Sequence, residues 1–380
     1  MKKKQDLMGL KKVEYDKDSS LCSAAWLAVR ELEKSGELKN ASQLQATRIR
    51  EYVKLLGDRG RINRALAAWL LGLMVQVHGP GKVLDAGALP GLLRAFGEED
   101  SLVPYTARDT LARLARADTT GRMARSLVSF LGDPEKEGRT RKRVARLLLD
   151  LASEEGTESL VQALDIPALV HLLDSGDAVS GFLSGRAGQI LQYLAYRKRE
   201  QEVTRQLVGA IRRKAFSSTE LFSTLGDVVK GNGPAILLEL DGISLLVGYL
   251  ERPAEELHTK ALTVLMKATA EGGAQAIIQA GGLPILLRLL EDESLAVRHN
   301  AAATLASLAA DGEAEAVAAA GVLPGLNQLL SAGNRDARIS AARALSLLGD
   351  GEAQRLCQEL EAEEEEDWGE LEDSLDDILE

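Results

Sequence analysis

The feature of this sequence that most constrains its fold is a punctuation signal that returns after 40 residues. The segment AGGLP at 280–284 is followed by an amphipathic run at 285–290 and by a longer helical run that ends at Ala309. The segment AGVLP at 320–324 opens the same order of runs, so that Pro284 and Pro324 lie 40 residues apart. Gly and Pro interrupt helices, and the apolar positions between them keep a helical period. A fixed period near 40 predicts an all-α solenoid.

Earlier copies of the signal are present but weaker. VLDAGALPGLL at 83–93 is clear, ALDIPALV at 163–170 keeps its proline, and LDGISLLV at 240–247 has Ser244 instead. The anchors 90, 167 and 244 are separated by gaps of 77 residues, close to two periods. This spacing predicts hidden copies near 127 and 205, where MARSLVSF (123–130) and VTRQLVGAI (203–211) are short amphipathic runs. With 62–77 as the last helix of a first unit, we expect about eight units.

Composition agrees with closely packed helices. The 380 residues are 45% hydrophobic but only 4% aromatic, whereas a strand-rich fold would use more aromatic and β-branched residues. The two cysteines, Cys22 and Cys357, lie near opposite ends, which argues against a disulfide framework and for a reducing compartment. The longest apolar run, 65–77, is too short to cross a bilayer. We expect an intracellular protein, cytoplasmic (cilium and cytoskeleton included), or organellar if a transit segment is missing.

The distribution of charge separates a tail from a body. Residues 361–380 hold twelve carboxylates and no Lys or Arg, so the other 360 residues carry a net charge of +1 although the chain carries −11. We therefore expect three parts. They are a flexible basic arm at 1–20, a solenoid at 21–355 and an acidic tail at 356–380.

The punctuation resembles that of the armadillo repeat, a three-helix unit with an A-G-x-L-P signal before its second helix and a long third helix. The resemblance covers roughly residues 40–350 and is most specific in the last two units. It implies a right-handed superhelix whose third helices line a concave groove. HEAT repeats, which have two helices per unit, are the structural alternative. Stacking is required in either case, because one unit cannot bury its apolar face alone.

The resemblance also places residues in the groove. Peptide-binding relatives similar to importin-α carry a Trp and an Asn, four residues apart, on each third helix. Here no Asn occurs at the Asn positions and only Trp69 occurs at the Trp positions, which argues against a nuclear-import receptor. The expected groove residues are Trp69, Arg113, Arg143, Arg146, Arg186, Tyr193, Lys260, Lys267, Asn300 and Arg343.

These groove residues are largely basic and favour an acidic protein or peptide partner. The alternative interpretation is that they are solvated charges on exposed helix faces, and Asp109 and Asp150 interrupt the stripe. A nucleic-acid partner is disfavoured, because the whole chain is acidic and aromatic residues do not interleave the basic ones.

The acidic tail carries a second signal. Trp368, Leu371, Leu375 and Ile378 would form one apolar edge on an acidic helix, typical of a segment that docks on a separate partner or on the chain's own groove. The alternative is a disordered solubilising tail.

The sequence contains no motif that matches the catalytic or cofactor-binding patterns considered. The four histidines include His78 at an expected helix end and His171 in an apolar run, and no Cys–His set has zinc spacing. GPGK at 79–82 is followed by Val83 rather than the Ser or Thr of a phosphate loop. We expect a non-enzymatic interaction scaffold without a cofactor. Its versions are a structural subunit of a ciliary or organellar assembly, an adaptor for acidic peptides, and, by resemblance, a nucleotide exchange factor for a heat-shock chaperone.

Overall fold

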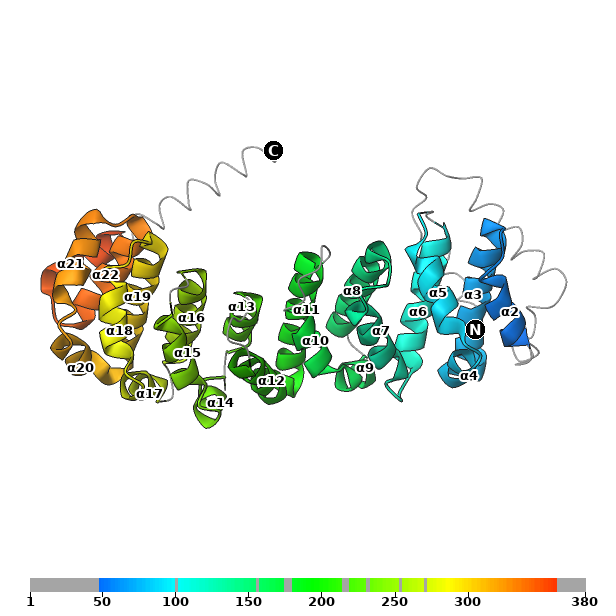
Figure 1. Ribbon diagram of the computed structural model, residues 1–380, viewed down its shortest axis with the longest axis horizontal. Helices are drawn as coiled ribbons and strands as arrows, with labels where there is room; N and C mark the ends of the chain where they lie inside the picture. Colours follow the sequence, from blue (N-terminus) through cyan, green and yellow to red (C-terminus); the bar gives the residue numbers. More distant parts are fainter. Residues whose placement is uncertain are drawn as a thin grey trace, which may run out of the picture. The chain divides into compact units, whose positions relative to one another are not determined.

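The fold is helical wherever the structure describes the chain. The computed structural model describes residues 48–99, 102–154, 157–173, 180–213, 219–229, 233–252, 255–269 and 272–360. These residues contain helices and turns and no strand, which confirms the all-α prediction. The chain divides into two compact units. Figure 1 labels the helices of both. The expected arm at 1–20 and residues 361–380 of the expected tail lie outside the described residues.

The N-terminal unit comprises the described residues of Met1–Ala168 and Asp177–Arg186. Its helices are α2 (Ile49–Leu55), α3 (Arg61–His78), α4 (Pro80–Asp85), α5 (Ala88–Gly97), α6 (Leu102–Ala117), α7 (Arg122–Gly132), α8 (Gly138–Ser153) and α9 (Glu158–Ala163). The unit also contains the first residues of α10 (Ile166–Leu172) and of α11 (Ser180–Leu194), which end in the C-terminal unit.

The C-terminal unit contains the rest of the described chain. Its helices are η5 (Ala195–Arg199), α12 (Glu200–Arg213), α13 (Thr219–Val228), α14 (Gly233–Glu239), α15 (Gly242–Leu250), α16 (Glu255–Lys267), α17 (Gly273–Gln279), α18 (Gly282–Leu289), α19 (Leu295–Leu308), η6 (Ala309–Glu313), α20 (Ala314–Ala319), α21 (Leu323–Ala332) and α22 (Arg335–Leu347). Residues 351–360 add a last helical segment.

The punctuation signal has a backbone cause. Gly87, Gly281 and Gly321 stand between a short helix and the next one with φ of 79°, 79° and 78°, a left-handed conformation that L side chains disfavour. In the weaker copy Asp241 takes this conformation, with φ 52°, just before α15. Asp tolerates the left-handed region better than most residues do, so the turn survives without its glycine. The glycine signal therefore marks where one helix of a unit ends and the next begins.

The two hidden copies fold with one helix where the clear copies have two. α7 contains the run at 123–130, α12 contains the run at 203–211, and each is followed by a third helix, α8 or α13. Neither run is interrupted by a Gly-Pro signal, so nothing divides the helix. Before α12 the chain kinks at Arg197 and Lys198, where Lys198 has φ 69°.

The core consists of short apolar side chains. In α18 and the residue after it, Leu283, Ile285, Leu286, Leu289 and Leu290 are buried, whereas Leu287 is half-buried. In α19 and α22, alanines occupy much of the buried surface, which lets the two helices pack closely. Cys357 is buried in the last helical segment, and Cys22 lies outside the described residues. No helix in the described part of the chain combines the length and apolar character needed to span a bilayer.

Candidate functional site

All ten groove residues predicted from the sequence lie on third helices, the last helix of each repeat: α3, α6, α8, α11, α16, α19 and α22. Each of these side chains is half-buried or exposed. They divide between the two units, because Trp69, Arg113, Arg143, Arg146 and Arg186 belong to the N-terminal unit and the rest to the C-terminal unit. Two separate surfaces therefore have to be considered.

Three of the predicted residues are engaged in local contacts. Arg113 Nε donates to Asp109 Oδ2 at 2.7 Å, one turn earlier on α6. Lys267 Nζ donates to the carbonyl of Gly226 at 2.7 Å, and Asn300 Nδ2 donates to the carbonyl of Ala296 at 2.8 Å. These bonds hold the side chains close to their own helices or to the preceding repeat, so each is less available to a partner than its sequence position suggests.

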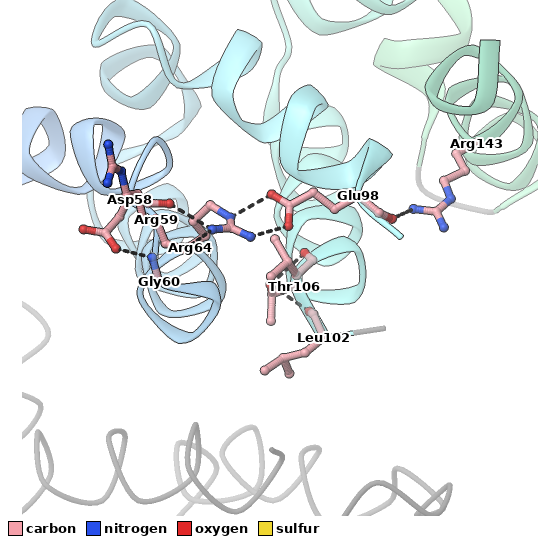
Figure 2. Close-up of polar contacts among 9 residues, drawn as sticks. Asp58, Arg59, Gly60, Arg64, Glu98, Leu102, Thr106 and Arg143 are labelled. Carbon is pink, nitrogen blue, oxygen red and sulfur yellow. Dashed lines mark hydrogen bonds and ion pairs between the residues drawn. The ribbon is translucent and has the colours of Figure 1, made fainter. Parts of the chain in front are cut away.

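Arg143 has a positioning contact that the sequence did not indicate. Its Nη1 donates to the carbonyls of Phe96 at 2.5 Å and Glu98 at 2.8 Å, where the C-terminal end of α5 favours a cation. Figure 2 shows that Glu98 in turn accepts two hydrogen bonds from Arg64 of α3, at 2.8 and 2.7 Å. Arg64 also donates to the carbonyls of Asp58 and Arg59. The network thus links α3, the end of α5 and α8.

Beside this network lies a pocket of about 320 Å³ between the end of α5, the first turns of α6 and the middle of α8. It is lined by Phe96, Pro104, Tyr105, Arg108, Arg143, Arg146, Leu147 and Asp150, and we call it the aromatic–arginine pocket. Tyr105 is 52% exposed, so its ring is accessible to a partner. The volume lies at the lower end of ligand pockets, which suits one or two side chains of a partner.

The charges at the pocket are only partly paired. Arg108 Nη2 lies 2.9 Å from Asp150 Oδ2, with both side chains about half exposed, so this ion pair is weak and exchangeable. Arg146 has no carboxylate partner among the described residues. The pocket therefore presents an excess of positive charge next to an exposed aromatic ring.

Arg146 also belongs to a second feature, which we call the Phe182 cluster: Lys142 and Arg146 of α8 with Phe182 and Arg186 of α11. Lys142 Nζ lies 5.7 Å from the centre of the Phe182 ring, and the guanidinium carbons of Arg146 and Arg186 each lie 5.2 Å from it. Cations favour the negative face of an aromatic ring at such distances. One ring is therefore shared by three cations.

The basic start of α8 runs against local preference. Arg139, Arg141, Lys142, Arg143 and Arg146 fall in the first nine residues of the helix, where the helix dipole favours acids. Three of the five have structural partners. Besides Arg143, the buried Arg141 donates to the carbonyl of Leu131, and Arg139 pairs with Glu99, whose carboxylate raises the pKa of Arg139. Lys142 and Arg146 are left facing the pocket and the ring.

The third-helix surface of the C-terminal unit differs. Its aligned positions hold Thr263 and Lys267 on α16, Ala303 and Ser307 on α19, and Arg343 on α22. The Ser307 hydroxyl donates to the carbonyl of Ala303 on its own helix. On α19 these small side chains offer neither an aromatic anchor nor charge, and the exposed aromatic residue of this unit's third helices, Tyr193, lies on α11 instead.

Sequence reasoning missed Phe96, Tyr105, Arg108 and Phe182. The alignment followed two positions near the end of each third helix, whereas Tyr105 and Arg108 lie in the first two turns of α6. Phe182 lies one turn before Arg186, so the i, i+4 spacing could have linked it to that predicted residue.

The histidines have structural contacts. The buried His258 contacts the carbonyl of Arg252 through Nε2 at 2.5 Å, and His299 Nδ1 contacts the Ser340 hydroxyl at 3.2 Å. Within the part of the chain that the structure describes, no group of three His, Cys, Asp or Glu side chains could hold a metal ion.

Residues 271–310, which contain α17, α18 and α19, match the family model of the armadillo/beta-catenin-like repeat. This segment is an armadillo repeat. Among solved structures, the chain is similar to an engineered protein from a structural genomics consortium, with 23% identity, 82% of this chain and 81% of that chain covered, and a TM-score of 0.49. It is also similar to computationally designed armadillo repeat proteins for modular peptide recognition, with 19% identity, 79% and 100% coverage and a TM-score of 0.33. No curated protein matches it.

Proposed function

We propose that this protein is an interaction scaffold or adaptor whose N-terminal unit binds an acidic segment of a partner protein at the aromatic–arginine pocket. Armadillo repeats typically serve as protein-interaction scaffolds, which supplies the broad class. The observation that carries the proposal is the pocket itself, in which Tyr105 and Phe96 stand beside Arg108, Arg143 and Arg146. Aromatic and Arg side chains are the residues that most often dominate protein interfaces.

Charge decides the class of partner. Arg146 and Lys142 have no carboxylate partner among the described residues, and the exposed Arg108–Asp150 pair is weak enough to exchange for a partner's carboxylate. Arg binds carboxylates in a two-pronged geometry that a neutral segment cannot use. These two cations, together with the exchangeable Arg108, therefore favour an acidic segment and accelerate its association.

Size decides the form of partner. A space of about 320 Å³ admits an aromatic or aliphatic side chain but not a folded surface. The partner is thus an extended segment that places one apolar side chain in the pocket and acidic residues against the surrounding cations. Tyr105 and Arg108 lie three residues apart on α6, and Arg143 and Arg146 lie three residues apart on α8, so each pair shares one face of its helix. An extended segment can contact both faces.

The experiment measures binding of a fluorescently labelled synthetic peptide of Glu residues with one central Trp by anisotropy. The full chain carries either Lys142→Glu with Arg146→Glu, or the matched pair Lys260→Glu with Arg343→Glu in the C-terminal unit, which changes the net charge equally. We expect the first pair to weaken binding by about tenfold or more and the second by less than about twofold. An equal loss for both pairs, or none for the first, would refute the proposal.

The three specific functions predict different sets of co-purifying proteins. An adaptor should co-purify with a varying set of proteins that contain acidic segments, whereas a structural subunit of a ciliary or organellar assembly should co-purify as one stoichiometric complex. A nucleotide exchange factor should co-purify with a chaperone that dissociates when nucleotide is added. The docking role proposed for Trp368, Leu371, Leu375 and Ile378 concerns residues outside the described chain and stays a prediction, as do the intracellular compartment and the absence of catalysis.

A further inference from the structure

The aromatic–arginine pocket and the last twenty residues of the chain have complementary chemistry. Residues 361–380 hold twelve carboxylates and no Lys or Arg, and Trp368 directly follows five consecutive acids, Glu363–Asp367. An apolar anchor flanked by carboxylates is what the proposed function requires of a partner. Trp26, by comparison, has one carboxylate, Glu31, within five positions of it. The tail at 361–380 therefore carries the partner's chemistry within this chain.

We propose that residues 361–380 of a second copy of the chain dock at the aromatic–arginine pocket, with Trp368 as the anchor. The inference rests on the proposed function, because it uses the same site, and it adds self-association and competition with a partner. A space of about 320 Å³ admits one indole beside the exposed ring of Tyr105. The acids before Trp368 then meet Lys142 and Arg146, which have no carboxylate partner among the described residues.

The point where the tail begins decides which copy supplies it. Leu360 is buried in the C-terminal unit, and its carbonyl accepts a hydrogen bond from Arg335 Nη2, at the start of α22, at 3.3 Å. Trp368 comes eight residues later. Eight residues span at most about 29 Å even when fully extended.

That reach is short compared with the stack of helices. Packed helices lie about 8–10 Å apart, so the link from Leu360 to Trp368 covers about three steps between neighbours. The third helices α13, α16, α19 and α22, which pack in succession, already take up three such steps within the C-terminal unit. The pocket belongs to the N-terminal unit. We therefore assign the docked tail to a second copy rather than to the same chain.

This contact has a consequence for assembly. Each copy offers one tail and one pocket, so the contact joins two different surfaces and generates closed rings or open chains of copies. Its ion pairs form at an accessible surface and are screened by salt. The association is therefore reversible, and it strengthens with protein concentration and weakens with salt. A partner with an acidic segment competes with the tail for the same pocket.

The test is a complementation experiment with full chains, followed by sedimentation velocity. Trp368→Ala removes the anchor and leaves the charge of the tail unchanged, whereas Lys142→Glu with Arg146→Glu removes the cations at the pocket. We expect the unchanged chain to form larger species as its concentration rises, and each variant alone to self-associate about tenfold or more weakly. Mixed in equal amounts, the two variants should form a one-to-one complex, because one supplies a pocket and the other a tail.

The matched control is Lys260→Glu with Arg343→Glu, which changes the net charge equally in the C-terminal unit. It should self-associate within about twofold of the unchanged chain. A mixture of the two defective variants that stays monomeric, or undiminished self-association of Trp368→Ala, would overturn the inference. So would an unchanged chain that stays monomeric while Trp368→Ala binds the Glu–Trp peptide, the labelled peptide of Glu residues with one central Trp, more tightly. That result would place the tail in the pocket of its own chain.

Binding of the Glu–Trp peptide to Trp368→Ala separates this inference from the proposed function. If the peptide binds this variant, loses affinity when Lys142→Glu and Arg146→Glu are added, and no self-association is found in the unchanged chain, the proposed function stands and the inference fails. If the added substitutions leave the affinity for the peptide unchanged, the proposed function itself fails.

Discussion

The third helices of the two units are used differently. In the N-terminal unit, α6 and α8 are joined by exposed ion pairs, Arg108 with Asp150 and Arg116 with Glu154, and they leave a pocket between the first turns of α6 and the middle of α8. In the C-terminal unit, α19 and α22 meet through alanines, with the small residues Ala303 and Ser307 at the outward positions of α19 and Arg343 on α22. The first surface has room and charge to spare for a partner, while the second is occupied with stacking.

Each unit has a buried threonine where one third helix stacks on the preceding one. The buried Thr110 hydroxyl of α6 donates to the carbonyl of Ala68 on α3 at 2.7 Å. The buried Thr304 hydroxyl of α19 donates to the carbonyl of Asn300 on its own helix at 2.7 Å and lies 3.5 Å from the carbonyl of Leu262 on α16. Buried hydroxyls require such partners. The stacking faces of the two units are therefore alike, and their outward faces differ. We propose that the stacking face serves stability and that the outward face of the N-terminal unit serves binding.

The largest expected effect concerns stacking in the C-terminal unit. A Cβ at Gly273 would lie 1.6 Å from the carbonyl oxygen of Ala268, a backbone atom that has little freedom to yield. Gly273→Ala should lower the free energy of unfolding by about 3 kcal/mol or more, measured by chemical denaturation. Gly272→Ala is the control, because its Cβ would contact no other atom. Only its backbone would be strained, at a φ of 90°, and we expect the free energy of unfolding to fall by about 1–2 kcal/mol. The affinity of the folded protein for the Glu–Trp peptide should not change. If Gly273→Ala also weakened peptide binding, the proposed separation between stability in the C-terminal unit and binding in the N-terminal unit would be wrong.

The next effect tests whether the network in Figure 2 positions the pocket. Arg64→Gln removes the paired hydrogen bonds to Glu98, whose carbonyl holds Arg143, and both partners are about four-fifths buried, with side-chain exposures of 19% and 24%. We expect a loss of about 1–2 kcal/mol in stability. We also expect weaker binding of the Glu–Trp peptide.

Arg122→Gln is the control for this network, since it breaks the exposed pair with Asp85 outside the pocket. Arg122→Gln should leave the free energy of unfolding and the affinity for the Glu–Trp peptide nearly unchanged. If Arg64→Gln left peptide affinity intact while lowering stability, the network would be structural only.

A smaller effect depends on pH. Burial alone would raise the pKa of Asp118, but hydrogen bonds from the Met123 and Thr120 N–H groups and the Thr120 hydroxyl lower it below its usual value. A lowered pKa in the folded state contributes stability above the unfolded value, near 3.9, and loses it as pH falls through the folded value. Asp118→Asn should therefore cost about 1 kcal/mol at neutral pH and progressively less below about pH 4, in urea titrations. A constant difference down to pH 2 would exclude this ionic role.

The smallest expected effect concerns the weakened punctuation of the C-terminal unit. Asp241 adopts φ 52° where the clearer copies have glycine. Asp241→Gly should raise the free energy of unfolding by about 0.5 kcal/mol, which would appear as a slightly higher thermal midpoint. The reason is that the relief of backbone strain exceeds the added conformational freedom of the unfolded chain. Asp241→Asn, which tolerates the same conformation, should be neutral. A destabilised glycine variant would show that the Asp side chain itself holds the turn.

The stacking face could be predicted from the sequence, because glycine, proline and the spacing of apolar residues determine the ends and the buried faces of helices within a single repeat. The signal at 280–284 located the turn at Gly281, and the spacing of the anchors located α7 and α12 without any Gly-Pro signal in them.

The binding face could be predicted only in part. Arg143 and Arg146 were assigned to it from their position on a third helix, but the bond from Arg143 to the carbonyls of Phe96 and Glu98 depends on residues more than 40 positions away. Tyr105 and Phe182 join the same surface from other helices. Contacts of this kind between repeats are set by how each unit is stacked, which the pattern within one repeat does not contain.

The most direct test of the central claim, that the basic and aromatic surface of α6, α8 and α11 binds acidic segments, is a charge-swap cycle. Affinities are measured for the Glu–Trp peptide and for its Lys counterpart, on the unchanged chain and on Lys142→Glu with Arg146→Glu. The account predicts coupling: replacing Glu by Lys in the peptide costs at least about tenfold less on the variant than on the unchanged chain. The same cost on both proteins would mean that the peptide binds elsewhere, and would contradict the account.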